Sequence, residues 1–236
     1  MFRPFRRVLA ASIVASGLPS NAVAEDIAVA MRFDTDWFYN GLSESSGEPA
    51  FGASLDWQLT DHLFTGVYGH EVLEEDLNVP RGVGAFVGVG FALSEAWYVS
   101  GIANQRWFPG SVGEWDYLEW QSTLQWSPTA TERITFKLAY ADDFYGRDNR
   151  SSLLEASYRR DLGERWYALF TAGAIRFSNN DALPDYEYLQ FGGGYRISSV
   201  TFDLSWRANS EGGNARVGFG RLESPSIVGQ LTWRVW

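Results

Sequence analysis

The stretch that decides the fold is LEWQSTLQW, residues 118–126, which a short turn joins to RITFKLAY, residues 133–140. In both segments apolar and polar side chains alternate, with Trp, Leu, Ile or Phe on one face and Glu, Gln, Arg or Lys on the other. A period of two is typical of β-strands, because successive side chains point to opposite faces. The two segments therefore predict neighbouring antiparallel strands that have one apolar and one polar face.

The same alternation recurs outward from this pair along the whole chain. It predicts about twelve strands, near residues 26–34, 51–59, 63–72, 83–91, 97–107, 118–126, 133–140, 154–159, 166–177, 189–197, 200–207 and 230–235.

The connections alternate strictly between short turns and longer segments rich in Gly, Pro, Asn, Asp and Ser. The longer ones are residues 41–49, 74–81, 109–114, 146–150, 178–185 and 209–225. This order indicates an all-β, transmembrane antiparallel β-barrel with short periplasmic turns and longer extracellular loops. Strands of about 10 residues suit tilted membrane spans, and twelve of them use up the chain, with ten or fourteen as alternatives.

The N-terminus has the order of a secretory signal peptide. Arg3, Arg6 and Arg7 precede an apolar run, and small residues lead to Ala24. The run is shorter than the roughly 20 residues of a membrane-spanning helix. We therefore expect residues 1–24 to be removed and residues 25–236 to form the barrel domain.

Composition narrows the class of protein. Without residues 1–24 the chain keeps 16 bases and 29 acids, a net charge of −13, and it contains no cysteine. An acidic surface argues against nucleic acid as a partner, because binding phosphates requires basic residues. Stability must come from a source other than disulfides, and a closed hydrogen-bonded barrel provides one.

Aromatic residues concentrate at the two predicted rims, as bilayer interfaces select. At the short-turn rim we expect a belt of Trp57, Trp97, Trp126, Trp166 and Trp236. At the long-loop rim we expect Trp107 and Trp115, joined by Trp37, Phe144, Phe177, Tyr186 and Tyr188. A soluble β-sandwich also has alternating strands, but it needs an apolar interior. The belts and the polar faces favour a barrel in the outer membrane of a Gram-negative bacterium.

The polar strand faces are expected to line the lumen. By parity they carry Asp34, Asp56, Glu119, Gln121, Gln125, Arg133, Lys137, Glu155, Arg159, Asp203, Arg207 and Arg234. Both signs of charge occur, and the bases gather on the later strands. Such charges tune selectivity in an open pore, or they pair with one another and fill a narrow barrel.

The segment GLSESSGEPA, residues 41–50, followed by the strand from Phe51, resembles the first-loop signature of the TorF-type putative porin family of proteobacteria. That signature reads Arg-Gly-x-Ser-Gln-Ser before Pro-Ala and a strand. Here Asn40 stands in place of the arginine and Glu44 in place of the glutamine. RWFPG at 106–110 and YLEW at 117–120 resemble later stretches of the family. The resemblance covers about the first half of the mature chain and implies a barrel in the outer membrane.

Catalytic chemistry has little support in the sequence. The two histidines are His62, in a short turn, and His70, near the loop rim, which has Glu71 beside it and no serine nearby in sequence. A barrel lipase would need a serine nucleophile next to a histidine, and a protease would need converging acids. Loop acids such as Asp142 and Asp143 suit calcium, but their spacing matches no metal motif. We expect no enzyme, no metal and no cofactor.

The sequence thus predicts an outer-membrane, porin-like channel for passive diffusion of small hydrophilic solutes or ions. The alternative is a non-conducting structural or binding barrel that presents its loops at the cell surface. The expected partners are outer-membrane lipid and lipopolysaccharide, the outer-membrane assembly machinery and the solutes themselves.

Overall fold

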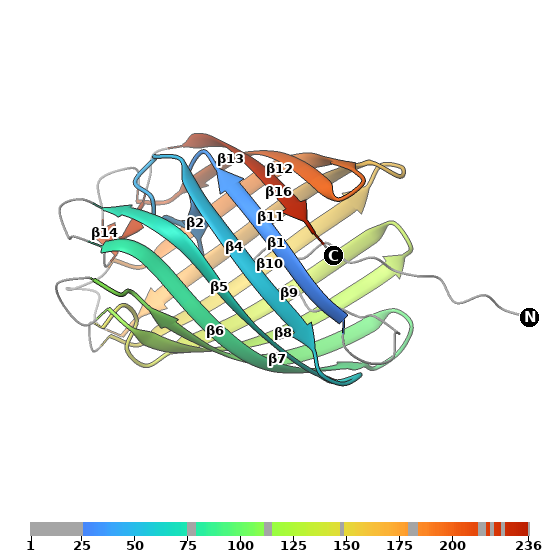
Figure 1. Cartoon of the computed structure of the whole chain (residues 1–236), viewed down its shortest axis with the longest axis horizontal. Helices are drawn as coiled ribbons and strands as arrows, with labels where there is room; N and C mark the ends of the chain where they lie inside the picture. The colour runs from blue at the N-terminus through green and yellow to red at the C-terminus, as the bar shows by residue number, and fades with distance from the viewer. Residues whose placement is uncertain are drawn as a thin grey trace, which may run out of the picture.

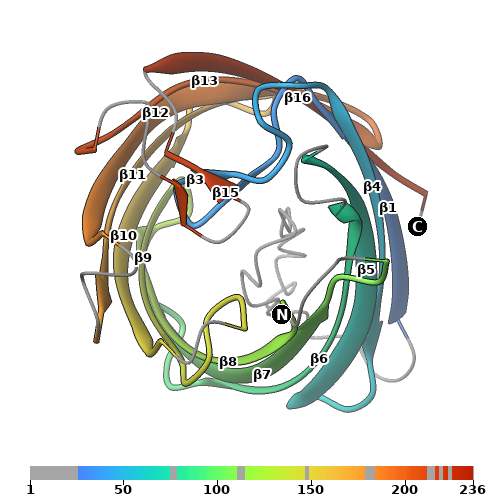
Figure 2. The same cartoon turned by 90° about the vertical axis from the view of Figure 1, so that its left-hand side faces the viewer.

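The computed structural model describes residues 26–74, 79–110, 115–146, 149–178, 184–211, 216–217, 220–222 and 225–235. In these residues twelve antiparallel strands close into a single barrel, seen from the side in Figure 1. A second sheet of four short strands lies inside one end of the barrel, as the view along the axis shows (Figure 2). None of the described segments is a helix long and apolar enough to cross a bilayer.

The barrel strands follow one another around the wall in chain order. They are β1 (Asp26–Asp34), β4 (Ala50–Gln58), β5 (Leu63–Glu74), β6 (Val79–Ala92), β7 (Trp97–Trp107), β8 (Tyr117–Thr129), β9 (Glu132–Ala141), β10 (Ser151–Asp161), β11 (Trp166–Phe177), β12 (Tyr186–Ile197), β13 (Val200–Asn209) and β16 (Ser226–Arg234).

The first and last strands close the wall. Met31 of β1 pairs with Trp233 of β16 on one side and with Ala53 of β4 on the other. Every barrel strand therefore has two hydrogen-bonded neighbours. Closure leaves no strand edge with unpaired backbone groups, which is the condition for placing a sheet in lipid.

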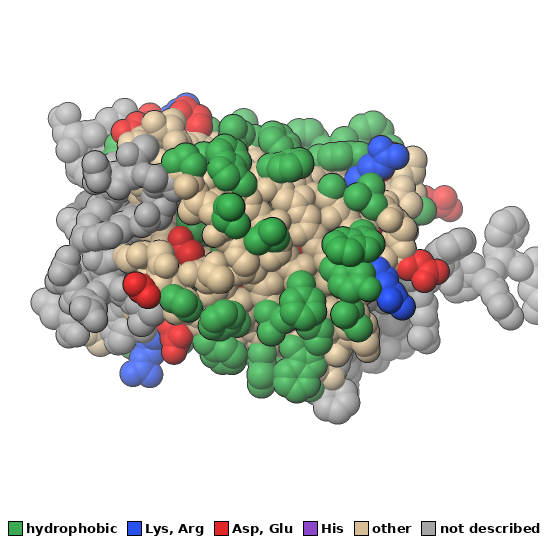
Figure 3. Space-filling model, turned by 90° about the horizontal axis from the view of Figure 1, so that it is seen from above, with side chains coloured by type: hydrophobic (Ala, Val, Ile, Leu, Met, Phe, Trp, Pro, Cys, Tyr) green, Lys and Arg blue, Asp and Glu red, His purple; other side chains and the backbone are tan. Residues whose placement is uncertain are grey.

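The pleat separates apolar from polar side chains across the wall. In β8, Leu118 and Trp120 are exposed on the outside, whereas Glu119 and Gln121 are buried inside. Figure 3 shows the result on one face, where apolar side chains spread over the middle of the barrel and charged ones lie toward its two ends. Apolar side chains thus lie outside and polar ones inside, the opposite of a soluble protein, as a lipid-facing surface requires.

These strands confirm the predicted fold class. Twelve strands form the barrel, and β7 and β11 begin and end at the predicted residues. The predicted signal peptide, residues 1–24, and Trp236 lie outside the described residues, so the predicted domain boundary stays a prediction.

Three of the predicted long loops contain strand structure and correct the sequence analysis. Strand β5 extends to Glu74 and strand β6 begins at Val79, so residues 74 and 79–81 of the predicted loop belong to strands. The segment 209–225 contains β14 (Arg216–Val217) and β15 (Gly220–Arg221). The first loop, which we call loop one and define as residues 35–49, contains β2 (Phe38–Tyr39) and β3 (Leu42–Ser43).

Loop one folds back into the barrel instead of extending beyond it (Figure 2). Its two short strands form a hairpin around Asn40 and Gly41, which have φ values of 50° and 82°. Asn-Gly favours such turns because both residues adopt positive φ readily. A side chain at position 41 would also overlap the ring of Tyr188 on β12. Strand β3 then pairs with β15, which joins the hairpin to the last long connection.

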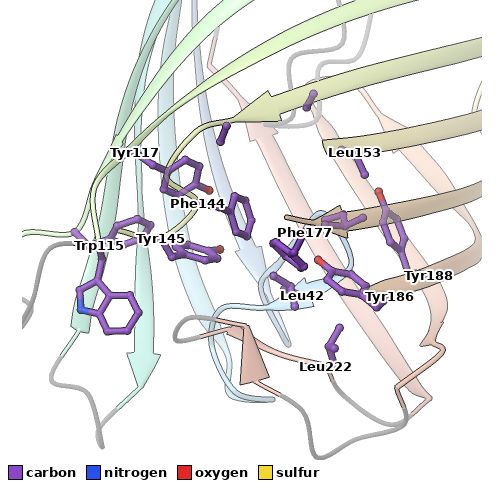
Figure 4. Packing of buried hydrophobic residues seen from close by; sticks show 14 of the residues in the cluster. Leu42, Trp115, Tyr117, Phe144, Tyr145, Leu153, Phe177, Tyr186, Tyr188 and Leu222 are labelled. Carbon is purple, nitrogen blue, oxygen red and sulfur yellow. The ribbon is translucent and has the colours of Figure 1, made fainter. Parts of the chain in front are cut away.

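A cluster of buried apolar residues lies inside the loop end of the barrel, around loop one. Leu42 of β3 is fully buried among Phe144, Phe177 and Tyr186, which come from three other segments (Figure 4). Leu222, next to β15, completes the cluster from below in this view. Loop one therefore has its own apolar core, which is enclosed by the barrel wall.

Candidate functional site

Glu44 of loop one binds side chains of the barrel wall. Glu44 is fully buried, and Arg106 Nη2 lies 2.9 Å from both of its carboxylate oxygens. His70 Nε2 lies 2.7 Å from Oε2, and the Tyr145 hydroxyl donates to Oε1 at 2.5 Å. Partners from β5, β7 and the loop after β9 thus converge on one loop-one side chain.

The charge of Glu44 depends on these partners. Burial alone would raise its pKa, but the Arg106 charge and the hydrogen bond from His70 outweigh burial and lower the pKa from 4.5 to about 2. Burial, followed by the neighbouring Glu44 charge, raises the pKa of the Tyr145 hydroxyl well above 10.0. At neutral pH Glu44 is therefore ionised and Tyr145 remains a donor.

Two aromatic rings of loop one cover the wall residues that bind Glu44. Trp37 stacks on His70 at a centroid distance of 4.6 Å and an interplanar angle of 3°. The Arg106 guanidinium lies 3.9 Å from the centre of the Tyr39 ring. A desolvated cation over an aromatic face adds roughly 2 kcal/mol. Loop one thus holds His70 and Arg106 from both sides, with a carboxylate and with rings.

A second set of contacts ties the hairpin to the opposite wall. The Tyr39 hydroxyl donates to Glu119 of β8 at 2.5 Å. Lys137 of β9 donates to the Asn40 side chain at 3.0 Å and lies 3.5 Å from Glu155 of β10. The tip of the hairpin is thereby fixed by β8 and β9, and the loop bridges the lumen.

Below loop one the barrel encloses a cavity of about 220 Å³. Phe38, Asn40 and Gly41 of the hairpin line it on one side, and residues of β1, β8 to β13 and β16 line the rest. The charged residues of the lining are Arg32, Arg133, Lys137, Glu155, Arg159, Asp203 and Arg207. Five of these seven side chains are basic.

The side of the lumen formed by β5 and β6 is filled with rings instead. Tyr68 and Phe64 of β5 pair in register with Gly84 and Gly88 of β6. A Cβ at either glycine would overlap the ring of its partner. Glycines therefore let aromatic side chains lie flat over the neighbouring strand. The lumen is asymmetric, with packed rings on one side and a charged cavity on the other.

All ten charged residues predicted to line a pore lie on inner strand faces, and the structure divides them. Six line the cavity, namely Arg133, Lys137, Glu155, Arg159, Asp203 and Arg207. Asp34 is buried and binds the Arg32 side chain. Glu119 belongs to the loop-one contacts, Asp56 accepts from Ser54, and Arg234 lies near Asp56 at the turn end. That these residues line a conducting pore stays a prediction.

The aromatic belts require a correction at the loop rim. Trp115 is only 6% exposed, and the same side of the wall buries Trp37, Phe144, Phe177, Tyr186 and Tyr188. These rings pack inside the barrel around loop one and cannot form an outer belt. The alternation of side chains along β12 already places Tyr186 and Tyr188 on the face opposite to the outward-facing Leu189. Among the other tryptophans, Trp57, Trp97, Trp107 and Trp166 are exposed, and Trp126 is partly buried against Trp97.

The residues that fix loop one were not identified from the sequence as a site. Arg106 and Glu44 were noted only as part of a family resemblance, and Tyr39 and Tyr145 were not noted. The available signal was Asn40-Gly41, a hairpin turn between short apolar pairs. It indicated an ordered loop, but contacts between residues 44, 70, 106 and 145 depend on the closed barrel.

The histidines do not form a catalytic arrangement in the described residues. His70 is buried between Trp37 and Glu44, whereas Glu71 points outward and accepts from the Phe51 amide. His62 lies in an exposed turn with its Nδ1 3.1 Å from the Gly90 carbonyl oxygen. Within the same part of the chain, acids, histidines and cysteines form no group that would hold a metal ion.

Solved structures of bacterial channels have the same fold. The chain is similar to the KdgM porin, with a TM-score of 0.60 and 4% identity over 88% of this chain and 98% of that one. It is similar to the NanC porin, with a TM-score of 0.59 and 12% identity over 87% and 98%. An outer membrane channel from Pseudomonas putida F1 gives a TM-score of 0.55 and 12% identity over 94% and 99%. No family model and no curated protein matches the sequence.

Proposed function

We propose that the mature chain is an outer-membrane channel for passive diffusion of small hydrophilic solutes or ions, and not an enzyme. The observation that carries the proposal is a cavity lined by charged side chains inside a closed barrel whose outer surface is apolar. A barrel that served only as an anchor would have no need of buried charge, which is costly unless it binds water, ions or partners. The shared fold with solved porins supports the same function.

In this proposal loop one is the constriction. It bridges the lumen through Glu44, Tyr39 and Asn40, above the cavity. Passage of a solute then requires the hairpin to shift or the solute to pass beside it. The short turns face the periplasm, and the loops face outward toward lipopolysaccharide.

The partners follow from the same arrangement. Outer-membrane lipid covers the apolar band, lipopolysaccharide surrounds the loop rim, and the outer-membrane assembly machinery inserts the exported chain after removal of residues 1–24. The TorF-type porin family is the family we propose, on the likeness of residues 41–50.

A second function has a specific observation in its favour. Glu44 and Arg106 are 0% and 1% exposed, and the rings around them exclude solvent. A loop so firmly bound is also what a non-conducting barrel would have, with the outer loops as a binding surface.

Single-channel recording of the refolded mature protein in a planar bilayer separates the two functions. Discrete current steps that rise with salt concentration support a channel. A folded barrel that gives no steps, at any voltage and also after release of loop one by Glu44→Gln, contradicts the channel and supports the binding barrel.

A further inference from the structure

The cavity below loop one carries a charge opposite to that of the protein. The whole chain has 29 acids and 19 bases, whereas the cavity lining has two acids and five bases. A low-dielectric wall concentrates the field of such a cluster and attracts ions of the opposite sign. The excess of positive charge therefore singles out the cavity as a place for an anion.

The acids near the cavity do not match its bases one for one. Asp34 binds Arg32, and Glu155 lies beside Lys137. Asp161 is shared, since it lies 3.3 Å from Arg159 and 2.9 Å from Arg196. Asp203 also lines the cavity, where it accepts a hydrogen bond from the Tyr167 hydroxyl. The two carboxylates of the lining are thus fewer than its four guanidinium groups.

Arg207 is the clearest surplus charge. Its register neighbours are Gln190 and Ser226, and its Nε donates to Ser205 at 3.3 Å. Its guanidinium lies over the Phe38 ring at 4.6 Å. Among the described residues it forms no ion pair, and the charges of Asp34, Asp36 and Asp203 act on it from farther away. A buried guanidinium normally has an anionic partner.

Two further arginines face each other across neighbouring strands. Arg133 of β9 and Arg159 of β10 are direct register partners. Like charges opposite one another in a sheet repel, whereas the next charged pair on the inner face of the same strands, Lys137 and Glu155, is complementary. The Nη2 atom of Arg159 is buried and has no hydrogen-bond partner in the described part of the chain. An anion beside Arg159 would supply an acceptor for this Nη2 atom.

We propose that the basic lining of this cavity, with Arg159 and Arg207 among its arginines, binds a small organic carboxylate in transit. The inference rests on the proposed channel and names the class of solute. The planar guanidinium fork matches a carboxylate with two parallel hydrogen bonds. Phe38 and Leu169 in the lining give apolar surface for a carbon skeleton. The cavity volume lies below the roughly 300–1,000 Å³ of drug-sized sites, so the solute is small.

Calorimetry on the refolded mature protein in detergent tests the site directly. The probes are succinate, its neutral diamide and 1,4-diaminobutane, which have the same carbon chain and differ in charge. We expect succinate to bind and the other two to fail. Sulfate separates the sources of negative charge, because sulfate binding as tight as that of succinate overturns the assignment to carboxylates.

Three variants carry the test. Arg159→Gln and Arg207→Gln should each weaken succinate binding about tenfold, the usual loss for one charged hydrogen-bonding partner. Arg160→Gln is the matched control, since Arg160 lies next to Arg159 on β10 but is exposed on the other face. An equal loss in Arg160→Gln, or no loss in the first two variants, overturns the site.

Recording in a salt gradient keeps the two proposals apart. We expect a reversal potential of the sign that marks anion preference, reduced in Arg159→Gln and Arg207→Gln. Current steps with cation preference and no succinate binding would leave the channel standing and reject the anion site. Succinate binding without current steps would support the anion site and reject the channel.

Discussion

Replacing Glu44 by glutamine should release loop one from the barrel wall. The substitution keeps the shape of the side chain but removes the charge that faces Arg106, which is 1% exposed. One glutamine oxygen can still accept from Arg106 or Tyr145, while the new amide group faces His70 Nε2. The guanidinium is then left in a desolvated position without its anion.

The magnitude follows in two ways that agree. The pKa of Glu44 is lowered from 4.5 to about 2, which corresponds to about 3 kcal/mol between the charged and neutral forms. Removing one member of a buried ion pair costs roughly 3–5 kcal/mol in other proteins. A loss of about 3 kcal/mol changes the ratio of bound to released loop by about a hundredfold.

Single-channel recording measures this ratio as the time spent at each current level. We expect Glu44→Gln to visit larger conductance levels far more often than the unsubstituted protein. Glu48→Gln is the control, because Glu48 is an exposed acid of the same loop. Combining Glu44→Gln with Arg106→Gln removes both charges and should recover part of the loss. If Glu44→Gln and Glu48→Gln give the same records and the same urea midpoint, Glu44 does not hold the loop.

Acid should act on the same contact. Because the folded pKa of Glu44 lies below its unfolded value, its stabilisation is complete above about pH 5 and is lost as pH falls toward 2; urea midpoints between pH 7 and 3 should fall less steeply in Glu44→Gln. Gly84→Ala should cost about 1–3 kcal/mol of unfolding free energy, since its Cβ would overlap the aromatic ring that lies over it. Gly101→Ala, whose Cβ would have its nearest atom at 4.0 Å, should melt like the unsubstituted protein, and equal melting of both variants would contradict the packing argument. Leu204→Arg, in the middle of β13 and 62% exposed outside, should cost about 2–4 kcal/mol in lipid vesicles. Leu162→Arg in a short turn should cost little, and equal losses would reject the assigned lipid-facing surface.

The barrel could be predicted from the sequence because its information is local. Leu118, Trp120 and their polar neighbours alternate within one strand, so the period alone assigns each residue to a face. The order of short and long connections then fixes the neighbours of every strand. Neither step needs a contact between distant residues, and Trp97–Trp107 begins and ends at the predicted residues for this reason.

Loop one could not be predicted in the same way, because its position depends on contacts that are distant in sequence. Glu44 meets a residue from β7, 62 positions away, and one from the loop after β9, 101 positions away. The composition of residues 41–49 is that of an ordinary exposed loop, and it gave no indication of burial. The predicted aromatic belt at the loop rim was wrong for the same reason. Tyr186 and Phe177 lie at the loop rim as expected, but they face inward to pack against a loop that was assumed to be outside.

If the protein conducts as proposed, the contacts of loop one would govern opening and the arginines of the cavity would govern selectivity. Around loop one the charges are matched, because Glu44 faces Arg106 and Glu119 lies in the layer that holds Lys137 and Asn40. A matched cluster attracts neither sign of ion at a distance, so its effect is on whether the hairpin moves. The cavity beneath it has surplus positive charge centred on Arg207, but none of its arginines holds the hairpin by a hydrogen bond to a loop-one side chain among the described contacts. Lys137 belongs to both groups, since it lines the cavity and donates to Asn40 of the hairpin. In the proposed channel it therefore couples the position of loop one to the charge of the cavity.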